Sequence, residues 1–268
     1  MVKKLYKHEI QAYLRVWIPM QIVLLGIALL GRLIQLFESE AVVYNVINTS
    51  SIVAYVLAAV VAVGFVFVFS VVRFYKNLFT AEGYLSFTLP VTPTQHILVK
   101  LFTALLFYAA TIVTVLLSVC VITMGDVLCE VGKAIGYLWR VLWKEVGVHF
   151  GFYIAELTVL LAVLLMTTVL LYYACMSVGQ LSNKNRVLMA VVAYFVYYLI
   201  TQVFGTILIV IGFVMPDAWI TFFENYWIYH TKEALHWIFG GLIVWEGLLG
   251  TAYAFVTRHI LRRRLNLE

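Results

Sequence analysis

Residues 73–100 read RFYKNLFTAEGYLSFTLPVTPTQHILVK and separate two apolar runs, each long enough to cross a bilayer. Thr80 can cap the N-terminus of a short helix that carries Glu82 in its first turn, where a negative charge is favourable. Because the residue before a proline avoids helical backbone angles, this helix should end near Leu89. The stretch therefore predicts a short helix over about residues 80–89 inside the loop.

A second helix should begin almost at once, after the elbow Pro-Val-Thr-Pro at residues 90–93. Thr92 is suited to the N-cap, Pro93 fits the first helical position, and Gln95 completes a Thr-x-x-Gln capping box. Nothing from Pro93 to Thr123 breaks a helix, so this element should be about 46 Å long at 1.5 Å per residue. It exceeds the roughly 30 Å hydrocarbon core, so its lower end should project into the cytosol.

The composition indicates that this chain is surrounded mainly by lipid. Of its 268 residues, 64% are hydrophobic and only 12% are charged, which is too little polar surface to coat a soluble globule. The apolar runs are continuous rather than alternating, which favours helices over a barrel. We therefore predict an all-α integral membrane protein with a single membrane domain over residues 1–268.

At about 20 apolar residues per crossing, the sequence predicts six membrane spans. Their approximate bounds are residues 16–37, 47–72, 99–123, 152–178, 187–215 and 235–257. The first apolar run is long enough to remain as a span, so we interpret it as uncleaved rather than as a signal peptide.

The basic residues predict the orientation. With both termini in the cytoplasm, 13 of the 18 Lys and Arg residues face inward, in agreement with the positive-inside rule. These inward residues are Lys3, Lys4, Lys7, Arg15, Arg73, Lys76, Lys100, Lys184, Arg186, Arg258, Arg262, Arg263 and Arg264. The net charge of +5 thus belongs to the lipid surface, where basic residues meet anionic headgroups, and does not indicate a nucleic-acid partner.

Two further segments have helical amphipathic patterns. Residues 3–17 should form a helix that lies flat on the inner leaflet and turns into the first span near Pro19. Residues 126–150 form a second pattern on the outer side, in which Trp139 and Trp143 suit an interfacial position. This outer helix either rests on the outer leaflet or caps the bundle, and the sequence does not decide between them.

The sequence contains no G-x-x-x-x-G-K-[ST] phosphate loop, and its cytoplasmic segments are too short for a nucleotide-binding domain. No catalytic constellation and no metal-ligand spacing emerge, and we assign no redox role to the three cysteines. The six histidines map to loops or span ends, where we expect solvated imidazoles.

Two acids lie at membrane depth. Glu246, near the middle of the sixth span, either lines a translocation path or subunit contact, or is protonated and bonded to a neighbouring helix; Glu156 lies shallower, within reach of water.

The segment EGYLSFTLPVTPTQHILVKLF, residues 82–102, resembles the loop between the second and third spans of bacterial ABC transporter permeases of the type-2 export class. The matching elements are Glu82-Gly83, the elbow at residues 89–93, and Lys100-Leu101. The basic ending TRHILRRRLNLE is also similar to the tails of many such permeases. The outer segment of residues 126–150 departs from the family by being larger than simple members need.

The resemblance implies a coupling helix that docks on a separate ATPase subunit, which would bind ATP and Mg, and a transporter with two permease chains. It implies no cofactor and no catalytic residue on this chain, and a place in the bacterial cell membrane. The implied coupling residues are Glu82, Gly83, Tyr84, Leu85, Phe87, Pro90 and Pro93.

Two alternatives remain open: a proton-coupled secondary transporter that uses Glu246, and a non-transporting immunity or sensor subunit. An intramembrane enzyme is a further alternative.

Overall fold

The computed structural model describes residues 2–37, 42–88, 90–182, 185–214 and 217–263. Within these ranges the chain is helical and contains no strand. Six of the helices are long and apolar enough to cross a membrane, so the predicted class, a multi-pass helical membrane protein, is confirmed. The helices are α1 (Val2–Gln35), α2 (Val42–Phe79), α3 (Ala81–Thr88), α4 (Pro93–Thr123), α5 (Asp126–Val146), α6 (Val148–Gly179), α7 (Arg186–Val214) and α8 (Asp217–Arg263).

α1 continues through Pro19 as one helix. A proline inside a helix removes one backbone hydrogen bond, so contacts on both sides of it must hold the helix together. Tyr13 stacks on Phe107 of α4 before the proline, and Gln21 accepts a 2.7 Å hydrogen bond from Thr114 of α4 after it. Packing against α4 therefore outweighs the local tendency to break.

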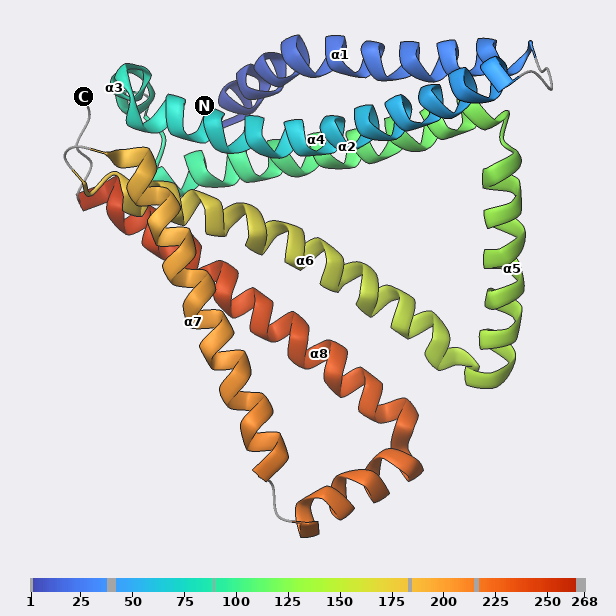
Figure 1. The fold of residues 1–268 in the computed structure, drawn as a ribbon. Helices are drawn as coiled ribbons and strands as arrows, with labels where there is room; N and C mark the ends of the chain where they lie inside the picture. Colours follow the sequence, from blue (N-terminus) through green and yellow to red (C-terminus); the bar gives the residue numbers. More distant parts are fainter. Residues whose placement is uncertain (1, 38–41, 89, 183–184, 215–216, 264–268) are drawn as a thin grey trace. The chain divides into compact units, whose positions relative to one another are not determined.

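The segment before the last span is helical rather than a loop. α8 begins at Asp217, and the backbone of His230 departs from helical angles, with φ −125° and ψ 30°. This residue marks the bend in α8 that Figure 1 shows. The membrane-length part of α8 runs from His230 to Arg263. The predicted end of the fifth span, Met215, lies outside the described residues.

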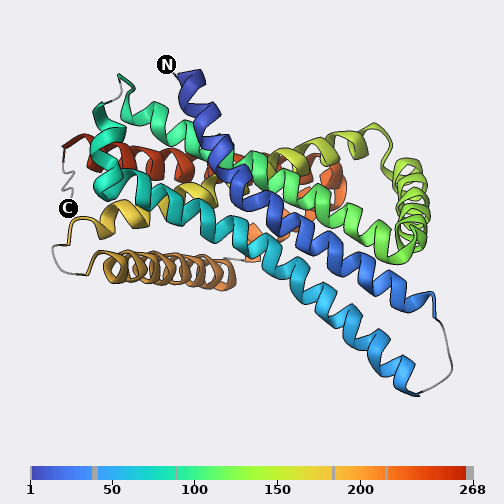
Figure 2. The same cartoon turned by 90° about the horizontal axis from the view of Figure 1, so that it is seen from above.

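The chain forms two compact units, Met1–Phe74 with Phe87–Val141 and Tyr75–Ser86 with Leu142–Glu268. In the first unit, α1, α2 and α4 lie side by side in both views (Figures 1 and 2). Their shared core contains Leu24, Ala28, Tyr55, Ala62 and Ile122.

Hydrogen bonds between helices supplement this core. The hydroxyls of Tyr55 and Ser118 lie 2.7 Å apart, and the indole N–H of Trp17 donates to Thr111 at 2.8 Å. Because lipid is as apolar as the side chains themselves, such bonds and close packing, rather than the hydrophobic effect, hold membrane helices together.

In the second unit, α6 contacts both α7 and α8. A side chain in place of Gly179 would begin only 2.5 Å from the carbonyl oxygen of Arg186, so only glycine permits the close approach of α6 and α7 at this end. α8 approaches α6 at Gly250, where a β-carbon would lie 3.0 Å from the hydroxyl of Thr167. That hydroxyl donates to the backbone carbonyl of Glu246 at 3.0 Å.

The predicted start of α4 is confirmed in detail. The Thr92 side chain accepts from the Gln95 amide at 3.4 Å, and the Gln95 side chain accepts from the Thr92 amide at 3.0 Å. Pro93 occupies the first helical position, and the helix runs without a break to Thr123. The long third span predicted from the sequence is therefore present with both of its expected ends.

The capping box makes the start of α4 testable. Replacing Thr92 by Ala removes the side-chain acceptor and should cost about 0.5–2 kcal/mol of local stability. We expect faster amide hydrogen exchange over residues 94–97, measured on the full chain in detergent micelles. Thr94→Ala, two residues on and outside the box, is the matched control; equal exchange in the two variants would contradict this role of Thr92.

Candidate functional site

The first unit contains a cluster of three charged side chains, one from each of its long helices; Glu9 and Lys100 are buried and Arg73 is half-buried. The carboxylate of Glu9 in α1 accepts from Lys100 Nζ of α4 at 2.7 Å through Oε1. Its other oxygen, Oε2, accepts from the guanidinium of Arg73 in α2 at 2.9 Å. Only 4% of Glu9 and 5% of Lys100 is exposed. We call Glu9, Arg73 and Lys100 the ionic cluster.

The ionic cluster satisfies each oxygen of the carboxylate with its own cation. Removing an ion from water costs several kcal/mol, and only close, well-directed partners offset this cost. Tyr13, one turn beyond Glu9 on the same face of α1, is 2% exposed and stacks on Phe107 of α4, so apolar contacts shield the cluster. Strong charge-assisted bonds in a shielded place link α1, α2 and α4 to one another.

Sequence reasoning missed this cluster. It assigned Arg73 and Lys100 to the headgroup layer, whereas the structure directs both toward Glu9. It did not single out Glu9, although this is the only acidic residue among the first 37. A lone acid in a basic, amphipathic segment was the available signal, but its partners lie 64 and 91 residues away.

α3 occupies the loop between the second and third spans, as the sequence predicts. Its first turn begins at Ala81, and the expected C-terminal residue, Leu89, lies outside the described residues. Thr80 does not act as the side-chain cap that we expected, because its hydroxyl donates to the Lys76 carbonyl of α2 at 2.6 Å. Its backbone carbonyl instead accepts from the Gly83 amide at 2.7 Å. Because Thr80 is the only residue between α2 and α3, it makes hydrogen bonds to both the end of α2 and the start of α3.

The seven predicted coupling residues differ in exposure. Tyr84 and Leu85 are 55% and 74% exposed, and Glu82 and Pro90 are exposed as well. Gly83 is buried, and Pro93 is half-buried at the start of α4. The exposed apolar surface of α3 is therefore centred on Tyr84 and Leu85.

Phe87 packs inward instead of presenting its ring to solvent. It is half-buried, and its ring lies 5.9 Å from that of His96 in the first turn of α4. His96 itself is 2% exposed, so the expected solvated imidazole is wrong at this position. Phe87 and His96 belong to the structure that holds the start of α4.

The two membrane-depth acids have different surroundings within the second unit. Glu246 in α8 is half-buried, and its backbone carbonyl, not its carboxylate, accepts the hydrogen bond from Thr167. Glu156 in α6 lies 2.8 Å from Nδ1 of His236 in α8, and Nε2 of His236 lies 3.0 Å from Nδ1 of His149. These three residues form a chain of hydrogen bonds that joins α6 to α8, which sequence reasoning also missed.

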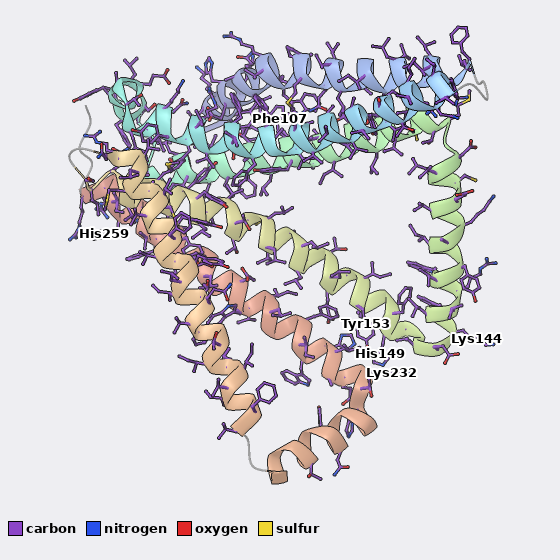
Figure 3. All side chains as sticks on the ribbon, in the orientation of Figure 1. Phe107, Lys144, His149, Tyr153, Lys232 and His259 are labelled. Carbon is purple, nitrogen blue, oxygen red and sulfur yellow. The ribbon has the colours of Figure 1, made fainter. Side chains whose placement is uncertain are left out.

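Figure 3 shows His149, Tyr153 and Lys232 gathered at the start of α6 and just beyond the bend of α8 at His230. The Tyr153 hydroxyl donates to the Lys232 carbonyl at 2.8 Å, and its ring lies 4.6 Å from that of His236. His236 uses both ring nitrogens on protein partners. Among the residues that the structure describes, no three His, Cys, Asp or Glu side chains converge into a set that could hold a metal ion.

No protein-family model, curated protein or solved structure matches this chain. Any functional conclusion must therefore come from the residues themselves. Two features of the first unit give the strongest support for a functional proposal. The first is the capped start of α4, and the second, seven residues further along the same helix, is the bond from Lys100 to the carboxylate of Glu9.

The ionic cluster predicts that replacing the carboxylate of Glu9 by an amide of the same size strongly lowers the stability of the chain. Glu9→Gln removes the negative charge to which Lys100 and Arg73 bond and should cost about 3–5 kcal/mol of unfolding free energy. The measurement is unfolding of the full chain in mixed micelles. Glu130→Gln, at an exposed acid of α5, should change stability by less than about 0.5 kcal/mol.

A double-mutant cycle separates the cluster from general disruption. Because Glu9→Gln and Lys100→Met each remove the same ion pair, the two changes combined should destabilise less than the sum of the two single changes. Additive effects, or a Glu9→Gln variant as stable as Glu130→Gln, would contradict the cluster.

Proposed function

We propose that this chain is the membrane-spanning permease subunit of an ATP-binding cassette exporter. Its own role is mechanical: α3 docks on a separate ATPase subunit, and α4 carries the resulting motion into the membrane. ATP and Mg belong to that partner chain. By the same proposal the transporter has two permease chains, resides in the bacterial cell membrane, and holds both termini of this chain in the cytoplasm.

The observation that carries the proposal is the path from the elbow to the ionic cluster within α4. The capping box fixes the first turn of α4 at Thr92 and Gln95. Lys100 lies about 10 Å along the same helix at 1.5 Å per residue, where its ammonium group bonds to Glu9. Since Glu9 also binds Arg73, a displacement of the start of α4 is passed to α1 and α2.

The exposure of α3 supports a partner at this place. Tyr84 and Leu85 present large apolar side chains on a helix of only eight residues. Such residues on a short, fixed helix are suited to a pocket in another protein, where buried aromatic and apolar anchors supply most of the binding energy. Their position in the loop that resembles the permease coupling segment favours an ATPase as that protein.

The proton-coupled alternative receives less support at the residue on which it depends. Glu246 is half-buried, and among the described residues the hydrogen bond at this position involves its backbone. Glu156, with its histidine partners, is the better candidate for handling protons in this chain. The immunity or sensor alternative shares the ATPase contact and differs only in cargo flux.

The docking surface gives a direct test. Tyr84→Asp with Leu85→Asp places two charges in the proposed interface, and we expect at least a tenfold loss of the ATPase that co-purifies with the tagged chain, or about 1.4 kcal/mol of binding. The readout is ATP hydrolysis by the material purified from native membranes in mild detergent. Tyr137→Asp, at a residue of α5 that is 63% exposed, is the matched control.

An unchanged yield of ATPase in the Tyr84/Leu85 variant would contradict the docking surface. Transport that persists without ATP and is abolished by Glu246→Gln would instead support the proton-coupled alternative.

A further inference from the structure

α5 is an amphipathic helix without a buried face. Its 21 residues run from Asp126 to Val146, and none of them is buried within the part of the chain that the structure describes. One stripe of the helix is apolar, and the opposite stripe is polar and charged. The apolar stripe consists of Leu128, Val131, Ile135, Leu138 and Leu142.

The apolar stripe is open to its surroundings. Val131, Ile135 and Leu138 are 44%, 57% and 54% exposed. Trp139 and Trp143, four residues apart, follow one edge of the stripe and are 46% and 47% exposed. Tryptophan prefers the boundary between headgroups and acyl chains, because its ring is apolar while its N–H needs a polar partner.

Both ends of α5 are fastened to membrane-length helices by very short connections. Only Met124 and Gly125 separate it from α4, and only Gly147 separates it from α6. All three connecting residues have positive φ, at 50°, 86° and 67°. Such left-handed residues end one helix and allow the next to take a new direction.

These connections restrict the depth of α5. α5 is not among the described helices that are apolar enough to cross the membrane, so the end of α4 and the start of α6, which α5 joins, must lie at the same membrane surface. A helix about 31 Å long that is held at both ends at one depth must lie roughly parallel to the membrane plane. We infer that α5 lies along the membrane surface at which α4 ends, with its apolar stripe buried in the lipid of that leaflet.

The charges of α5 favour lipid over a charged protein partner. The helix carries three acids, Asp126, Glu130 and Glu145, and three bases, Lys133, Arg140 and Lys144. This balance offers no net attraction to a partner of either sign, nor to anionic headgroups. Burial of the apolar stripe is therefore the main driving force, and binding should not require anionic lipid.

A second copy of this chain is the main competing occupant. Gly132 and Gly136 have the four-residue spacing that lets membrane helices approach closely, and a β-carbon at either position would meet nothing within 4 Å. They lie on the flank with the tryptophans rather than in the apolar stripe. The experiment must therefore distinguish lipid from a second protein chain.

Spin labels on the full chain provide this distinction. In a background carrying Cys120→Ala, Cys129→Ser and Cys175→Ala, single cysteines replace Ile135 and Leu138 on the apolar stripe and Lys133 and Arg140 on the polar face. The labelled chain is reconstituted into phosphatidylcholine vesicles, with and without phosphatidylglycerol, and collision rates with oxygen and with a water-soluble nickel complex are measured.

We expect oxygen to reach positions 135 and 138 several-fold better than nickel does, and the reverse at positions 133 and 140, in both lipid compositions. Equal nickel access on the two faces would overturn the inference, because the stripe would then face water. Shielding of positions 135 and 138 from both reagents would overturn it in favour of a protein cover. Dipolar broadening that disappears on dilution with unlabelled chain would identify that cover as a second copy.

Discussion

The carboxylate of Glu9, placed between Lys100 and Arg73, is the interaction on which the first unit most depends. In a chain whose solvent is largely lipid, apolar side chains gain little by leaving lipid for one another. Directed polar contacts therefore decide which helices stay together. Glu9 supplies two such contacts in a place where water does not compete, and it joins α1, α2 and α4 in a single cluster.

Under the proposed function, the ionic cluster connects the start of α4 to α1 and α2, so that a movement of one helix can reach the others. A long helix transmits movement only if its end is fixed and its side is tied to its neighbours. The capping box provides the first condition, and the bond from Lys100 to Glu9 provides the second. Further along α4, Thr111 and Thr114 bond to Trp17 and Gln21 of α1. These bonds join α1 and α4 at several points along their length.

Local features of the fold could be predicted from the sequence. Both ends of α4, its capping box and the existence of α3 and α5 follow from signals within a few residues of one another. The unbroken helix at Pro19 shows the limit of this reasoning. The angles that proline prefers are local, but the packing that keeps α1 continuous comes from α4, about 90 residues away.

The candidate site was predictable only in part for the same reason. Exposure of Tyr84 and Leu85 agrees with the pattern of an apolar surface on a short helix. The inward packing of Phe87 on His96, and the pairing of His236 with Glu156 across 80 residues, depend on which helices are neighbours. No spacing within one segment contains that information, and an isolated charge such as Glu9 is the only trace that the sequence leaves.

The central claim, that α3 receives force from an ATPase, is tested most directly by photo-crosslinking from Leu85 in living cells. The residue is replaced by a benzophenone amino acid, and the crosslinked product is identified by mass spectrometry. The account predicts a nucleotide-binding ATPase chain as the main product, absent when the probe replaces Tyr137. Crosslinks to lipid alone, or only to other copies of this chain, would contradict it.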